Sequence, residues 1–320
     1  MIKFLLSTIF ILTTYFTVAL AQQDRQFTQF MFDRMSYNPA TTGFNGYCGT
    51  LIYRNQWDRV QDAPNTTLLN VQGNLQNLNV GRGTVGVGLS LSNDVIGFLK
   101  SNNVVMNAAY HMPTDYGTLS TGVGVGLINV GFDPNWVTPS TPVELDPSLV
   151  GITQKIGQTG FDNNFGLYWY GDQDYYVGFS MTHVAPAKLT NLSFNMARHY
   201  YVMAGVKKEI NKGHNVPIFL NPSTLIKADG ATMVFDLNLK VDVWVSKDAY
   251  FWGGITYRLS DAFAFMAGYA RDNFKVGYSF DAMTNPLSGY GRGSHELMVS
   301  YCIFPPKKST TRTGWLFKLR

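Results

Sequence analysis

Charge is scarce in this chain. Asp, Glu, Lys and Arg make up 14% of the 320 residues, well below the roughly 25% that is usual for soluble domains. The hydrophobic fraction is an ordinary 45%, while aromatic residues reach 14% and there are 31 glycines. This combination is typical of a β-barrel with one apolar and one polar face. The net charge of +4 comes from mostly scattered basic residues, which gives no indication of a nucleic-acid partner.

Long apolar runs are missing after the N-terminus. No uninterrupted apolar stretch beyond Ala21 reaches the ~18 residues of a transmembrane helix. The N-terminus has Lys3, an apolar run over 4–18 and an A-x-A sequence at 19–21, which together are typical of a secretory signal peptide. We expect cleavage after Ala21, because the run is short for a membrane anchor and small residues end it. No cysteine follows that would carry a lipid. Export without a spanning helix leaves the periplasm, the cell exterior or the outer membrane.

Catalytic and ligand-binding motifs are lacking too. A G-x-S-x-G sequence is absent, and 81–86 matches G-x-G-x-x-G only by its letters, because a strand pattern follows where a dinucleotide site needs a helix. The five histidines, at 111, 183, 199, 214 and 295, show no metal-ligand spacing and are expected at surface or lumen positions. We therefore predict a non-enzymatic protein without cofactor or metal. The enzymatic alternative is an outer-membrane phospholipase or protease.

Alternating apolar and polar residues predict strands along most of the chain. Each predicted strand is near the ~9–11 residues that a tilted membrane strand needs. The fourteen predicted strands are 46–57, 65–75, 83–92, 100–111, 116–129, 161–170, 175–183, 197–209, 216–228, 231–246, 248–259, 262–271, 273–282 and 294–304. In the last one, Leu297, Val299 and Tyr301 share one face, opposite Glu296 and Ser300. A soluble sandwich would alternate too, but it would not explain such scarce charge.

The connections between these strands divide by parity. The three longest, 130–160, 184–196 and 283–293, follow the fifth, seventh and thirteenth strands. Tight turns at 171–174, 247 and 272 follow the sixth, tenth and twelfth. Outer-membrane barrels have short periplasmic turns and longer outer loops. With both termini in the periplasm, the pattern predicts an all-β, transmembrane antiparallel β-barrel of fourteen strands.

The two cysteines stand at opposite ends of the predicted barrel. Cys48 lies early in the first strand and Cys302 late in the last. A closed barrel makes these strands antiparallel neighbours. Both side chains would face the lumen near the periplasmic rim. We expect them to approach each other across the seam, either as a disulfide or as two buried side chains.

The stretch before the barrel, 26–35, is rich in aromatic residues and methionine. Their spacing predicts a short helix or plug in the lumen near the periplasmic mouth, burying Phe27, Phe30, Met31 and Met35. Three alternate glycines, Gly122, Gly124 and Gly126, indicate strand curvature or close packing against such a plug.

Residues 26–43 also carry a family resemblance. The sequence QFTQFMFDRMSYNPATTGFNG resembles the opening of the PorP/SprF-like proteins of the type IX secretion system of Bacteroidota, whose pattern is Q-x-F-S-Q-Y-M-F-N-x-x-x-Y-N-P-A-x-A-G. Thr28, Phe30, Asp33 and Thr42 depart mildly from that pattern. YRNQW at 53–57 resembles the family's R-x-Q-W element. The matching residues are Gln26, Phe27, Gln29, Met31, Phe32, Tyr37, Asn38, Pro39, Ala40, Gly43, Arg54, Gln56 and Trp57.

The resemblance implies a function that strand patterns cannot give. It implies a non-enzymatic outer-membrane component of the type IX secretion system, a docking platform or anchor for secreted cargo and adhesins in gliding or surface attachment. The implied partners are the C-terminal domain of a secreted adhesin or other cargo, periplasmic ring components and outer-membrane lipid. The alternative is an outer-membrane transport barrel for small hydrophobic molecules, and a third is a purely structural porin.

The chain is expected to divide into four parts. These are a signal peptide (1–21), a lumen or periplasmic segment (22–45), the barrel (46–304) and a basic periplasmic tail (305–320) that contains Trp315 and Phe317.

Overall fold

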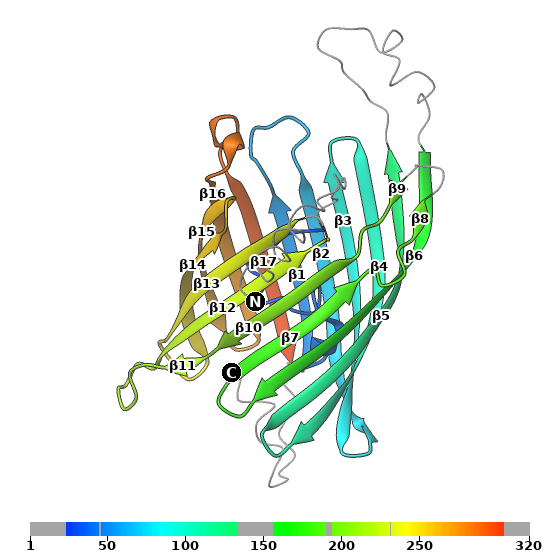
Figure 1. The fold of residues 1–320 in the computed structure, drawn as a ribbon. Coiled ribbons are helices and arrows are strands. Elements are labelled where there is room, and N and C mark those ends of the chain that lie inside the picture. Colours follow the sequence, from blue (N-terminus) through cyan, green and yellow to red (C-terminus); the bar gives the residue numbers. More distant parts are fainter. Residues whose placement is uncertain (1–23, 45, 133–155, 190–193, 231, 304–320) are drawn as a thin grey trace, which may run out of the picture.

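A computed structural model of the protein describes residues 24–44, 46–132, 156–189, 194–230 and 232–303. Fourteen strands among them form a closed antiparallel barrel (Figure 1). The strands are β1 (Tyr47–Asn55), β2 (Asn65–Val80), β3 (Gly83–Ile96), β4 (Leu99–Thr114), β5 (Gly117–Phe132), β6 (Ile156–Gly171), β7 (Tyr175–Thr182), β10 (His199–Val206), β12 (Ile218–Ala228), β13 (Met233–Trp244), β14 (Ala249–Arg258), β15 (Ala262–Arg271), β16 (Phe274–Met283) and β17 (Ser294–Ile303). The expected signal peptide, the tail and the centre of the 130–160 connection lie outside the described residues.

Each strand pairs with its sequence neighbours around the ring. The pairing of β1 with β17 joins the first strand to the last, as closure requires. The pairing of β7 with β10 and of β10 with β12 completes the wall. Two short strands, β8 (Lys188–Leu189) and β9 (Phe194–Asn195), form a separate two-stranded sheet, and β11 (Lys208–Glu209) pairs with β12. Among the described residues, no helix has the length and apolar character needed to cross a bilayer.

The fourteen predicted strands are confirmed, with one local correction. The strand predicted over 197–209 is interrupted after Val206 and resumes as β11. On the facing strand β12, Pro222 has no backbone N–H and cannot donate to the ladder. The β10–β12 pairing accordingly ends at Gly205 and Ser223. The wall therefore has a short break in its hydrogen bonding at this point.

The two faces of the wall differ as the alternation predicts. On β17, Leu297 and Tyr301 are about half exposed on the outer face, at 48% and 52%. Glu296, Met298 and Ser300 on the same strand are buried in the lumen. Apolar groups outside and polar groups inside suit a barrel whose outer face contacts lipid.

The two rims also differ. One rim, the long-connection rim, carries the long connections 56–64, 133–155, 183–198 and 284–293; the other, the short-turn rim, carries 81–82, 115–116, 172–174, 245–248 and 272–273. The predicted parity holds at these positions. It does not hold everywhere: the connection 207–217 is long and lies on the short-turn rim, and three short connections, 97–98, 229–232 and 259–261, lie on the long-connection rim.

Residues 24–44, the lumen segment, run through the barrel interior. The segment begins beside His183 and His199, which flank a connection of the long-connection rim, and ends before Tyr47 at the opposite rim. The segment is predicted near the rim where β1 begins, but its first residues lie at the other rim. The predicted helix is also absent: residues 28–32 and 35–37 form turns, and one 3-10 turn, η1 (Pro39–Thr41), follows.

Side chains of the wall and of the segment itself fix the backbone at the start of the segment. The N–H groups of Thr28 and Gln29 donate to the Glu296 carboxylate, over 2.8 and 2.9 Å. The N–H of Phe27 donates to the Tyr37 hydroxyl over 3.0 Å. The residues that follow form separate turns, closed mostly by hydrogen bonds to carbonyls three residues back, without the longer ladder of an α-helix.

Candidate functional site

The lumen segment fills the barrel with aromatic side chains. Phe27 and Phe30 are each only 1% exposed, and Tyr37 and Phe44 are also buried. They pack in one cluster with inward-facing residues of the wall, which include Ile52, Leu68, Tyr168, Tyr201, Leu225, Trp252 and Met298. Burial of apolar surface on this scale holds the segment in the lumen and excludes water from its centre. The predicted burial of Phe27, Phe30 and Met35 is confirmed, while Met31 is only partly buried.

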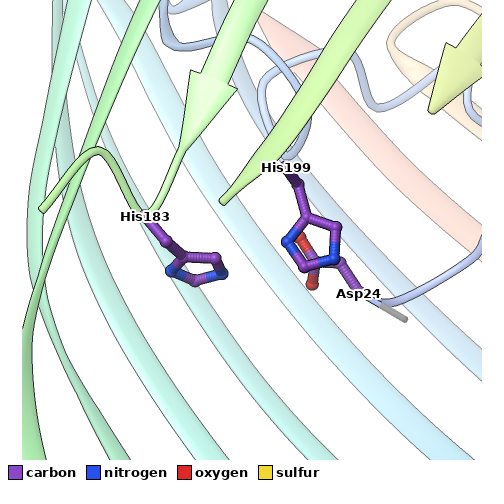
Figure 2. A group of neighbouring side chains, drawn as sticks. All are labelled: Asp24, His183 and His199. Atoms are coloured by element: carbon purple, nitrogen blue, oxygen red, sulfur yellow. The ribbon is translucent and has the colours of Figure 1, made fainter. Parts of the chain in front are cut away.

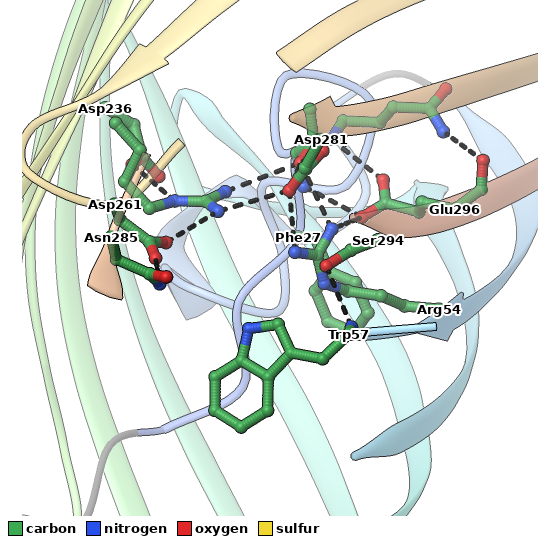
Figure 3. A network of polar contacts seen from close by, with 12 residues as sticks. Phe27, Arg54, Trp57, Asp236, Asp261, Asp281, Asn285, Ser294 and Glu296 are labelled. Atoms are coloured by element: carbon green, nitrogen blue, oxygen red, sulfur yellow. Dashed lines mark hydrogen bonds and ion pairs between the residues drawn. The ribbon is translucent and has the colours of Figure 1, made fainter. Parts of the chain in front are cut away.

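A buried ion network joins the segment to the wall (Figure 3). The Arg54 guanidinium lies 2.7 Å from Asp281 and 3.2 Å from Glu296, and it donates to the Thr28 hydroxyl over 3.2 Å. The Thr28 hydroxyl also donates to Asp281 over 2.7 Å. Arg54, Asp281 and Glu296 come from β1, β16 and β17, so the network fastens the segment across the barrel seam.

The network continues around the wall through Arg258 on β14. Its guanidinium lies 3.0 Å from Asp236 and 3.2 Å from both Asp281 and Asp261. Lys227 lies 2.8 Å from Asp236 and completes the chain of charges. Buried charges are tolerated only when they are paired and hydrogen-bonded. The alternation of signs satisfies that condition at each of these groups.

The Tyr37-Asn38-Pro39 turn is fixed by the opposite side of the wall. The Asn38 amide donates to the carbonyl oxygens of Leu167 and Phe179, over 2.9 and 3.3 Å, and its side-chain oxygen accepts from the Ala40 N–H over 2.9 Å. Pro39 suits the first position of η1, because the first N–H of a helix has no partner and proline has no N–H to leave unpaired. The Asn38 side chain therefore caps η1 and ties it to β6 and β7.

Gly122 lets the wall approach this turn. A Cβ at this position would overlap backbone atoms of Pro39 and Ala40. The predicted packing of a glycine against the plug is confirmed here. Gly124 and Gly126 instead face atoms of neighbouring strands. The wall also contacts the C-terminal end of the segment. His111 lies 2.8 Å from the Thr42 carbonyl, and Gly43 adopts a φ of +72°, which favours glycine.

The other motif residues have different surroundings. Phe32 is partly buried against Trp252, with ring centroids 4.6 Å apart. Gln26, also partly buried, lies near the start of the segment. Gln56 and Trp57 lie outside the ion network, in the connection after β1, where their N–H groups donate to Pro64 and Ser294. The structure thus brings Arg54 together with the lumen segment and leaves its two motif neighbours at the rim.

Cys48 and Cys302 face each other across the seam. They are directly opposite in the β1–β17 register, their Cα atoms are 4.1 Å apart, and a disulfide joins them. Both side chains are buried on the lumen side. The bond closes the ring covalently near the short-turn rim.

Two of the five histidines, to which their spacing in the sequence gave no role, lie close together in the structure. His183, after β7, and His199, at the start of β10, lie beside Asp24 of the lumen segment (Figure 2). All three offer ligand atoms within 4.8 Å of one another. No sequence signal could have revealed this group, since the residues are far apart in the chain.

Cavities remain on both sides of the segment. One, of about 140 Å³, opens between Arg34, Lys240, Lys275 and the disulfide. Another, of about 60 Å³, lies beside Asp24, Asp94 and His199. Charged and polar side chains interrupt the apolar part of both linings, which does not suit a continuous apolar conduit.

The barrel with its internal segment defines a plugged membrane β-barrel. A family model described as type IX secretion system membrane protein PorP/SprF matches residues 19–301. The chain therefore belongs to the PorP/SprF family of type IX secretion system membrane proteins. Both the fold and the family fit an outer-membrane location. No curated protein matches the chain.

Several solved outer-membrane proteins are similar at low identity. The toluene transporter TbuX of Ralstonia pickettii is 13% identical over 83% of this chain and 92% of that one, with a TM-score of 0.48. Omp33 of Acinetobacter baumannii is 10% identical over 80% and 98%, with a TM-score of 0.44. A Pseudomonas aeruginosa FadL homologue is 11% identical over 80% and 88%, with a TM-score of 0.43. Likenesses this weak do not indicate a shared function.

Proposed function

We propose that this protein is a non-enzymatic docking platform of the type IX secretion system, which anchors secreted adhesins or other cargo at the outer membrane. The observation that supports this role most strongly is the lumen segment, which is buried in the barrel and fastened by the ion network around Arg54. A lumen filled in this way suits a support for partners at its rims better than a passage for a folded protein. Family membership supplies the link to secretion.

The two rims offer two docking surfaces. The long-connection rim would face the cell exterior and hold the C-terminal domain of a cargo protein. The short-turn rim would face the periplasm and meet ring components of the secretion system. In this orientation the tail, 305–320, would be on the periplasmic side. The proposal also includes export by a signal peptide that is cleaved after Ala21.

Deletion of a single connection tests the platform role. Removal of 138–150 from the connection after β5 should abolish cargo retention at the surface, measured by labelling intact cells. Removal of 211–215 from the connection at the short-turn rim is the matched control and should leave surface cargo in place. Heat-dependent mobility in gel electrophoresis shows whether each barrel assembles. Unchanged surface cargo in an assembled first variant would contradict the proposal.

Isolation of partners provides a second test. Cross-linked outer membranes should yield the protein together with a large adhesin and periplasmic ring components, identified by mass spectrometry. Substitution of Arg54, the arginine of the ion network, should not affect capture of these partners in variants whose barrel still assembles. Recovery of neither class of partner would count against the platform.

One structural feature favours the alternative, a transport barrel for small hydrophobic molecules. A shallow groove of about 550 Å³ lies on the outer face at the break between β10 and β12, lined mainly by apolar residues. Val206, Pro222 and Ser223 line both this groove and the 140 Å³ lumen cavity. At the break in its hydrogen bonding, the wall therefore has the outer groove on one side and the lumen cavity on the other.

A cross-link across the break separates the two functions. Ala204 and Thr224 are paired residues beside the break, so an Ala204→Cys, Thr224→Cys variant in a Cys48→Ala, Cys302→Ala background can lock the wall. A transporter would lose uptake of a radiolabelled aromatic hydrocarbon on oxidation and regain it on reduction. A platform would show no such uptake, and its cargo retention would not depend on the cross-link.

A further inference from the structure

Three potential metal ligands converge at the start of the lumen segment. Asp24 belongs to the segment, His183 follows β7 and His199 opens β10 (Figure 2). One ligand atom from each lies within 4.8 Å of the others. Both histidines are buried, at 6% exposure each, and their rings meet edge to face with centroids 5.7 Å apart. Two imidazoles and a carboxylate form a donor set that divalent transition metals favour.

The neighbours of these residues orient them as metal ligands are usually oriented. The Nδ1 atom of His183 lies 2.7 Å from the Asp162 carboxylate, which leaves Nε2 as its coordinating nitrogen. A carboxylate behind a histidine fixes the ring and makes it a stronger donor to a metal. The Tyr201 hydroxyl donates to Asp24 over 2.6 Å, and the Tyr201 ring stacks on His199 with the ring planes 21° apart. All three ligands are thus held by side chains of the wall.

The local charge and space also suit a cation. Asp24, Asp94 and Asp162 lie around the group, and the Nε atom of Arg25 lies 3.6 Å from Asp24. Lys227 lines a small cavity with Asp24 and His199, but its charge is paired with Asp236. Three carboxylates against one guanidinium leave an excess of negative charge that a divalent ion would neutralise. The adjoining cavity of about 60 Å³ is lined by Asp24, His183 and His199, so a water molecule or a partner's side chain has room to complete the coordination.

We propose that Asp24, His183 and His199 bind a divalent transition-metal ion of the zinc class. Ligand atoms ~2.1 Å from a tetrahedral zinc ion lie roughly 3.4 Å apart. The ligand atoms here lie within 4.8 Å of one another, so they need to approach by up to about 1.4 Å to reach the tetrahedral spacing. The ion would join the lumen segment to β7 and β10 at the long-connection rim. The ion network around Arg54 holds the segment to β1, β16 and β17, so the metal would fasten the other side of the barrel.

Zinc binding to the full-length protein tests the site. The protein is purified from outer membranes in detergent with a histidine-free tag, stripped with a chelator and titrated with Zn²⁺ by calorimetry. One ion per chain is expected, and Co²⁺ should give the visible absorption of tetrahedral coordination. The His183→Ala and His199→Ala variants should each bind Zn²⁺ at least ~100-fold more weakly. The Asp162→Asn variant should lose about 10- to 100-fold, as second-layer partners of metal-binding histidines do.

His214 provides the matched control. It lies exposed in the connection at the short-turn rim, and the His214→Ala variant should bind Zn²⁺ like the wild type. Zn²⁺ should raise the unfolding temperature of the wild type and of this control, but not that of His183→Ala or His199→Ala. If an alanine variant fails to assemble, Asp24→Asn and His199→Gln provide the same comparison. No detectable Zn²⁺ binding by the wild type, or equal binding by the wild type and the ligand variants, would overturn the proposal.

Discussion

The Arg54 guanidinium lies 2.7 Å from the Asp281 carboxylate, and the two side chains are 2% and 1% exposed. Arg54 belongs to one motif of the chain, and the Thr28 hydroxyl, in the other motif, contacts both of these residues. The pair therefore connects two stretches of sequence that resemble the same family. One stretch supplies the lumen segment and the other supplies the charge that holds it.

Replacement of Arg54 by methionine should destabilise the barrel strongly. Arg54→Met leaves Asp281 and Glu296 without their shared partner, and loss of one member of a buried ion pair typically costs ~3–5 kcal/mol. Unfolding by urea, followed by tryptophan fluorescence of protein refolded in detergent, measures the change. Arg292→Met, at an exposed position of the long-connection rim, is the control and should remain within about 0.5 kcal/mol of the wild type. Equal stability of the two variants would show that the network does not hold the segment.

Removal of the Asn38 side chain should loosen the turn around Pro39. Asn38→Ala leaves the carbonyls of Leu167 and Phe179 and the N–H of Ala40 without this partner. We expect a loss of about 1–3 kcal/mol, because buried polar groups become unsatisfied. Asn93→Ala, which alters an exposed asparagine, should have little effect. Limited proteolysis should also cut the lumen segment faster in Asn38→Ala alone.

A methyl group at Gly122 should displace the lumen segment. The added Cβ in Gly122→Ala would overlap the backbone of Pro39 and Ala40, and overpacking of this kind typically costs ~1–3 kcal/mol. Gly49→Ala adds the same methyl group where no atom lies within 4 Å. The first variant should unfold at lower urea concentration and the second should match the wild type. The same midpoint for both would exclude close packing at Gly122.

The two cysteines should resist alkylation until they are reduced. Maleimide-polyethylene glycol should add to neither thiol in the denatured, unreduced protein and to both after reduction, seen as two shifts in gel mobility. Cys302→Ser should give one shift without reduction. The bond spans 254 residues, and constraint of so long a loop stabilises by up to ~5 kcal/mol. Shifts before reduction of the wild-type protein would show that the disulfide does not form.

Local patterns along the sequence determined the wall of this barrel. Alternation predicted the fourteen strands. It also predicted that Leu297 and Glu296 lie on opposite faces, because successive side chains on a strand point to opposite sides. The lengths of the connections gave the two rims. That Cys48 and Cys302 face each other followed from closure of the ring, because the first and last strands must then be neighbours.

Only the tertiary structure decided the path and conformation of the lumen segment. The spacing of Phe27, Phe30 and Met35 predicted a helix, but contacts with the wall, including those to Glu296 on the last strand, hold the segment in separate turns. The meeting of Asp24 with His183 and His199 also depends on residues that are distant in the chain. Contacts of this kind arise when the ring closes around the segment, so no local pattern records them.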